Sequence, residues 1–216
     1  MFSKRKILII LISAILFSML LFTGGCEKSP KEEADISGLL IISPVNISES
    51  ADKMDDAALV SLLEKLYKNA ALPANWIWGM WDQNIVVSID NVLLDESGNP
   101  KCYLVENIPN IEALKVNLEA IYSDKLLANI IYPMMISGNP SFFIEEDGKL
   151  YINPYATGVL YAAPDFTRAN VIKKSSDTFE IEVPMTQIDD AEGKIFVYKA
   201  VQQKGNWVLD NFFYFQ

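Results

Sequence analysis

The spacing of the hydrophobic residues changes along this chain of 216 residues, close to Pro140. Before that point most apolar side chains recur every three or four residues, and after it they alternate with polar ones. The first spacing gives a helix one apolar face, and the second gives a strand one apolar face. This order predicts an α+β domain in which two or three N-terminal helices pack on a curved antiparallel sheet.

Three segments are predicted to be helices. Residues 52–69 have apolar side chains at helical spacing and aspartates at the start, where the helix dipole favours anions, and Pro73 is expected to end this helix. Asn110 is expected to cap a second helix, and Ser123 a third that runs toward Pro133. The apolar faces consist of Leu59, Leu62, Leu63, Leu66 and Tyr67, then Ile111, Leu114, Leu118 and Ile121, then Leu126, Leu127 and Ile130.

The clearest hairpin signal is Asp147-Gly148 between the segments 142–146 and 149–152. Asp-Gly suits a two-residue turn in which both residues have positive φ. That turn would place Glu146 opposite Lys149 and Ile144 opposite Tyr151, so charge and shape would agree across the pair.

Three other strand pairs are predicted. Residues 85–94 end at a turn over 96–100 and should pair with 102–105. Residues 170–174 should pair with 178–183, and 195–203 with 207–215, each across a short polar turn. Helices followed by such a meander are compatible with a cystatin-like or nuclear-transport-factor-like cone.

The N-terminus has the features of a secretory signal. Lys4, Arg5 and Lys6 precede an apolar run over 7–22, which ends at Thr23-Gly24-Gly25-Cys26. This ending resembles the bacterial lipobox, so 1–25 is interpreted as a lipoprotein signal peptide and Cys26 as the lipidated residue. The alternative is an uncleaved transmembrane anchor, although the run is shorter than the roughly 20 residues of a typical span. Both interpretations place the remaining chain outside the cytoplasm, anchored to the cell membrane.

Residues 26–50 are rich in Ser, Pro, Lys and Glu and have no helical or alternating pattern. They are predicted to be an extracytoplasmic tether, with the alternative that the apolar patch 39–42 adds an edge strand to the domain. The remaining residues 51–216 suit a single domain.

Composition excludes several kinds of function. Removal of 1–25 would change the formal charge from −10 to −13, because it takes away three basic residues and no acidic one. Such a chain is poorly suited to nucleic acid or anionic lipid headgroups, and a basic protein surface or a cation is a better partner. The absence of histidine removes the usual general base and the commonest zinc ligand, so no catalytic residue, metal or cofactor is expected.

Two features after residue 50 leave alternatives open. Cys102 would be the only free thiol once Cys26 is lipidated, and a buried, inert state is expected for it. Trp76, Trp78 and Trp81 form a cluster that either anchors the core or, if exposed, binds a partner.

The order of segments resembles the IseA-type bacterial inhibitors of cell-wall D,L-endopeptidases. The resemblance covers about 111–215 and rests on three groups of residues: Ile111 to Tyr122 with Ser123-Asp124-Lys125, Glu146 to Tyr151, and Gly205 to Phe212. It implies a protein that binds the catalytic cleft of a peptidoglycan hydrolase and inhibits or regulates it. Asp147, Gly148, Lys149 and Tyr151 are interpreted as hairpin structure and not as interface.

A second hypothesis is an extracytoplasmic ligand-binding or enzymatic pocket, in which a buried carboxylate beside a tyrosine acts as a base. A third is a purely architectural surface module. A deep pocket lined by a carboxylate with a raised pKa would favour the enzyme. A filled core with a protruding acidic or aromatic loop would favour the inhibitor.

Overall fold

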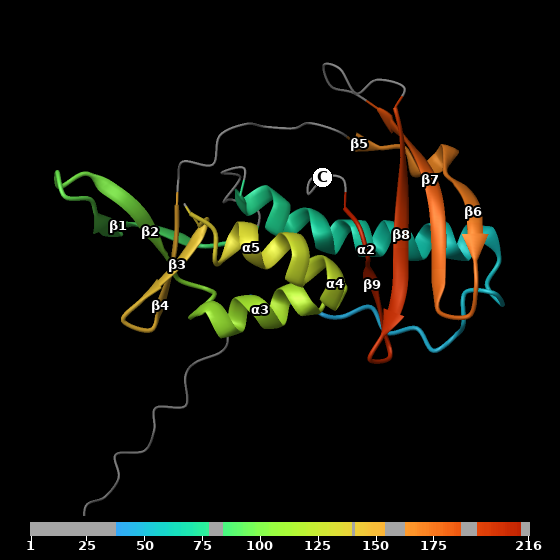
Figure 1. The fold of residues 1–216 in the computed structure, drawn as a ribbon, viewed down its shortest axis with the longest axis horizontal. Coiled ribbons are helices and arrows are strands. Elements are labelled where there is room, and N and C mark those ends of the chain that lie inside the picture. The colour runs from blue at the N-terminus through green and yellow to red at the C-terminus, as the bar shows by residue number, and fades with distance from the viewer. Residues whose placement is uncertain (1–37, 78–83, 140, 154–162, 187–193, 213–216) are drawn as a thin grey trace, which may run out of the picture. The chain divides into compact units, whose positions relative to one another are not determined.

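The computed structural model describes residues 38–77, 84–139, 141–153, 163–186 and 194–212 (Figure 1). The chain divides into two units, Met1–Gly38 and Leu39–Gln216, and all the elements described here belong to the second. Cys26, Trp78 and Trp81 lie outside the described residues.

The first helix, α2 (Asp56–Ile77), begins after Asp55, whose side chain accepts a hydrogen bond from the Ala58 N–H at 2.8 Å. Its apolar face is buried as predicted. The prediction that Pro73 ends the helix is wrong, because α2 continues through it. A proline inside a helix costs about 3 kcal/mol, and burial of Pro73, Ala74 and Trp76 in the core offsets this cost.

Both predicted helix caps are confirmed. The Asn110 side chain caps α3 (Ile111–Glu119) by accepting from the Ala113 N–H at 2.9 Å. The Ser123 hydroxyl caps α4 (Asp124–Leu126), which continues as the π-helical turn η2 (Leu127–Ile131) and then α5 (Tyr132–Met135). The widened turn lies directly before Pro133, which has no N–H with which to continue the α-helical ladder.

The first sheet has four antiparallel strands in the order β1-β2-β4-β3. Their bounds are β1 (Val87–Leu94), β2 (Pro100–Val105), β3 (Phe143–Glu146) and β4 (Lys149–Ile152). The predicted hairpin is confirmed: Ile144 pairs with Tyr151 and Glu146 with Lys149. Both turn residues have positive φ, 51° at Asp147 and 71° at Gly148.

The second sheet has five strands, with β5-β7-β8-β9 in order and β6 also paired to β7. The α+β class with antiparallel sheets is therefore confirmed, although the strands divide between two sheets. The last strand was predicted to run to residue 215, but β9 ends at Leu209. Residues 213–216 lie outside the described residues. The bounds are β5 (Ala163–Pro164), β6 (Asn170–Lys174), β7 (Thr178–Thr186), β8 (Ile195–Gln203) and β9 (Asn206–Leu209), with the 3₁₀ turn η3 (Phe166–Arg168) before β6.

Residues 39–47, here called the strap, pack on the domain. The Ile42 N–H donates to the Asn117 side-chain oxygen at 2.6 Å, and the Asn117 amide donates to the Leu40 carbonyl at 3.2 Å. Val45 forms an isolated antiparallel bridge with Trp207 at the outer edge of β9. The compact unit therefore begins at Leu39 and includes the apolar patch 39–42.

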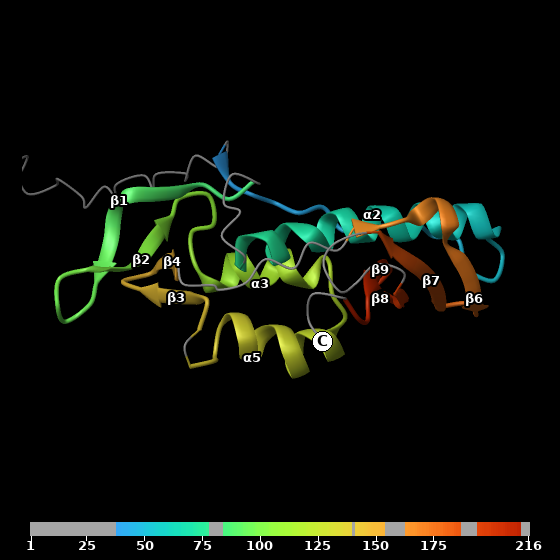
Figure 2. The ribbon, with the colours of Figure 1, turned by 90° about the horizontal axis from the view of Figure 1, so that it is seen from above.

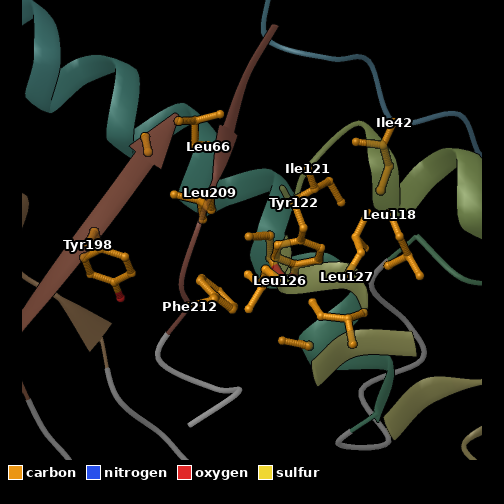
Figure 3. Close-up of a cluster of buried hydrophobic side chains, with 14 of the residues drawn as sticks. Ile42, Leu66, Leu118, Ile121, Tyr122, Leu126, Leu127, Tyr198, Leu209 and Phe212 are labelled. Carbon is orange, nitrogen blue, oxygen red and sulfur yellow. Dashed lines mark hydrogen bonds between the residues drawn. The ribbon is translucent and has the colours of Figure 1, made fainter. Parts of the chain in front are cut away.

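A single hydrophobic cluster connects the helices with both sheets. Helix α2 packs against β6 and β9, and α3 contacts β3 (Figure 2). Figure 3 shows Tyr122 and Phe212 among the aliphatic side chains at the centre of this cluster. The Tyr122 hydroxyl donates to the Ala70 carbonyl at 2.8 Å, so its polar atom is satisfied inside the core.

Candidate interaction surface

The hairpin β1–β2, here called the arm (residues 87–105), forms one side of the first sheet, in which β2 pairs with β4 and β1 is the edge strand. Among the described strands β1 pairs only with β2, and most of its side chains are exposed or half-buried. In both ribbon views the arm extends beyond the helices (Figures 1 and 2). A projecting hairpin with an exposed edge can offer both side chains and backbone groups to a partner.

The tip of the arm is organised by one carboxylate. The Asp95 side chain accepts hydrogen bonds from the N–H groups of Ser97 and Asn99, both at 2.9 Å. The Asp95 N–H in turn donates to the Asn99 carbonyl at 2.9 Å, and Gly98 adopts φ 81°. The hydrogen bonds to the Asp95 carboxylate hold its pKa below the usual value, and the bond from the Asn99 N–H has the largest effect. The tip therefore has a conformation defined by its own hydrogen bonds.

The middle of the arm carries a large irregularity in β1. Ser88 pairs with Leu104, and Val92 pairs with Tyr103, which is adjacent to Leu104 in β2. The three residues between Ser88 and Val92 therefore have no opposite partner, and β1 changes direction between its two ends in Figure 2. The Asn91 amide donates to the Ser88 hydroxyl at 2.9 Å and closes this bulge.

The base of the arm is held by Asn107, of which only 9% is exposed. Its side-chain oxygen accepts from the Val86 N–H at 2.9 Å, and its amide donates to the Asn84 carbonyl at 2.7 Å. The Asn107 carbonyl also accepts from the Leu40 N–H of the strap at 2.8 Å. One buried residue thus joins the start of the arm to the strap.

The charge of the arm is mainly negative. Asp90, Asp95 and Glu96 are exposed, as is Glu106 just after β2, against the single exposed cation Lys101. Exposed charges of one sign attract an oppositely charged partner and accelerate its association.

Trp76 belongs to the described residues among those that the sequence suggested for partner binding, and its side chain is buried, so it cannot contact a partner. It is fully buried and packs edge-to-face on Phe143, with ring centroids 6.5 Å apart. Of the two alternatives given for the cluster, Trp76 follows the first and anchors the core, because helix α2 extends past Pro73 and turns this side chain inward. Cys102 is buried, and burial raises the pKa of its thiol.

Two of the three groups that carry the family resemblance, those around Ser123 and Asp210, meet at the junction of α4 with β8 and β9. The Ser123 hydroxyl donates to the Asp210 carboxylate at 2.7 Å, and Lys199 lies 3.0 Å from the other oxygen of that carboxylate. The Asn211 side chain accepts from the Lys199 N–H at 2.7 Å and donates to the Val197 carbonyl at 2.8 Å. Each polar group here bonds to another part of the scaffold, so this cluster holds the domain together.

Two concave regions lie away from the arm. A groove of about 460 Å³ runs between α2 and the segment 166–171, and a smaller hollow of about 260 Å³ lies between α4 and Phe212. Both open to solvent. Among the aspartates that the structure describes, Asp95, Asp165 and Asp210 have a shifted pKa, and in each the shift is downward, which favours the ionised form.

Within the described ranges, no group of three or more Cys, Asp or Glu side chains is arranged to hold a metal ion. No helix in the same ranges has the length and apolar character needed to cross a membrane. No protein-family model matches this chain, and no curated protein is significantly similar to it in sequence.

Proposed function

We propose that this protein is a cell-surface lipoprotein, anchored through Cys26, that binds and inhibits or regulates a peptidoglycan D,L-endopeptidase. The observation that carries the proposal is the arm: a projecting, acidic hairpin with a preorganised tip, on a domain with one continuous hydrophobic cluster. Preorganisation reduces the entropy lost on binding, and this favours a tight complex with a concave partner.

The order of segments that resembles IseA-type inhibitors supports the same function. In the structure these residues form the junction around Ser123 and Asp210, together with the Asp147-Gly148 hairpin. They would serve as the scaffold, and the arm would supply the contact with the enzyme.

The enzymatic alternative has less support. The described grooves are open to solvent, and the carboxyl groups with shifted pKa values are stabilised as anions by hydrogen bonds or cations. A general acid or base near neutral pH would need a carboxyl pKa that is raised.

The test is to titrate the full chain, purified in detergent, into the digestion of purified peptidoglycan by D,L-endopeptidases at low and high salt. We expect stoichiometric inhibition that weakens as salt rises, because exposed charges are screened. Glu96→Lys at the tip should weaken inhibition at low salt. Glu49→Lys, which makes the same charge change at an exposed site outside the arm, should have a smaller effect. Absence of inhibition and of complex formation across the endopeptidases of the source cell would contradict the proposal.

A further inference from the structure

The bulge in β1 presents one aliphatic side chain to solvent. Ile89 is 75% exposed, the highest fraction among the exposed large hydrophobic residues of the described chain. It lies in the unpaired stretch between Ser88 and Val92, next to the exposed Asp90. An insertion of three residues takes these side chains out of the regular alternation of the strand.

The bulge has a defined internal structure. The bond from the Asn91 amide to the Ser88 hydroxyl spans it, and regular pairing resumes on both sides, at Ser88 with Leu104 and at Val92 with Tyr103. Because this backbone is fixed at both ends, Ile89 is presented in a restricted set of positions. A β-branched side chain adds further restriction at χ1.

Core packing does not account for the isoleucine. Val86 and Leu94 on the same segment are also exposed, at 50% and 58%. Single exposed aliphatic residues are common on protein surfaces. Two of the three, Ile89 and Leu94, lie on β1 itself, and with the neighbouring acidic side chains they have the composition of an apolar anchor with a polar rim.

We propose that Ile89 is the anchor residue of the arm and that it enters an apolar side-chain pocket of the partner, with Asp90 facing a cation at the rim of that pocket. The inference rests on the proposed function, and it adds the chemistry of the subsite that the arm recognises. The acidic charge of the arm supports a cationic rim, because an anionic rim would repel Asp90, Asp95 and Glu96.

The test measures the inhibition constant of the full chain against a D,L-endopeptidase that it inhibits, for Ile89→Ala, Ile89→Val and Asp90→Asn. Val116→Ala is the matched control, because Val116 is a 64% exposed aliphatic residue on α3, outside the arm. We expect Ile89→Ala to raise the inhibition constant about tenfold or more at every salt concentration, since apolar burial is not screened. Ile89→Val should retain most of the affinity, and Asp90→Asn should weaken binding mainly at low salt.

The outcomes separate the two proposals. Inhibition by the wild-type chain with equal constants for Ile89→Ala and Val116→Ala would overturn the anchor and leave the proposed function in place. Absence of inhibition by the wild-type chain would overturn both. Thermal unfolding of each variant shows whether a change in affinity reflects loss of fold, and a folded Ile89→Ala variant that has lost affinity supports the anchor.

Discussion

The junction of Ser123, Asp210 and Lys199 allows a quantitative prediction for Asp210→Asn. Only 8% of the Asp210 side chain is exposed. Burial opposes its ionisation, but the hydrogen bond from Ser123 and the contact with Lys199 outweigh that effect and hold the pKa of Asp210 below its usual value. The variant keeps the shape of the side chain and removes its charge.

The expected loss of stability has two parts. The hydrogen bond from Ser123 changes from a charged to a neutral acceptor, which costs about 1 kcal/mol. The ion pair with Lys199 is lost, and since 36% of the Lys199 side chain is exposed, this part is discounted to about 1 kcal/mol. The free energy of unfolding should therefore fall by about 2 kcal/mol, which lowers Tm by about 4–8 °C for a domain of this size.

The difference between wild type and variant should depend on pH with a definite sign. A carboxyl group whose pKa is lower in the folded state contributes stability above its unfolded pKa and loses it as the pH falls through the folded pKa. The difference should therefore be complete near pH 7 and should shrink as the pH falls below 3.8. Urea unfolding, followed by tryptophan fluorescence at pH 7 and pH 3, measures it.

The control for this experiment is Glu64→Gln, which removes an exposed ion pair with Lys68 on α2. Its effect should stay within about 0.5 kcal/mol at both pH values. The reasoning would be refuted if Asp210→Asn were as stable as wild type at pH 7, or if its deficit were unchanged at pH 3.

Three further predictions follow from other contacts. Gly148→Ala should lower the free energy of unfolding by about 1 kcal/mol, because φ is 71° there, whereas Gly38→Ala should be nearly neutral in urea titrations. Asn117→Ala should lower the free energy of unfolding by about 2 kcal/mol and speed hydrogen exchange at the Ile42 N–H of the strap, because this N–H loses its acceptor. Unchanged exchange at Ile42 would contradict this role of Asn117. Asp95→Ala should speed amide exchange at the tip of the arm and weaken inhibition severalfold while Tm stays within about 1 °C, as scanning calorimetry can check.

Local signals were enough for most secondary structure. Asn110 and Ser123 each precede an apolar run at helical spacing, and both form the expected caps. Asp147-Gly148 defines its own turn, because only residues that tolerate positive φ can close a two-residue hairpin of this kind. These predictions succeeded because the physics that governs them lies within a few neighbouring residues.

The errors arose where distant residues decided the outcome. Pro73 signals a helix end, yet burial of the residues around it keeps α2 intact through Trp76. Composition left two alternatives for 39–42, a tether or an edge strand of the domain, and the structure shows Asn107 and Asn117 bonded to the backbone of the strap from far along the chain. Hydrogen bonds from side chain to backbone over such separations leave no pattern in the sequence.

The sequence by itself determined the α+β class, the helix caps, the hairpins and the acidic charge, since each depends on local geometry or on composition. Tertiary structure decided that the strands divide between two sheets and that β1 is an edge strand with exposed side chains. It also decided that Ile89 emerges from a bulge. Strand partners and exposure depend on which surfaces the complete fold covers. The candidate interaction surface therefore became visible only in the structure, where β1 is an edge strand paired with β2 on one side.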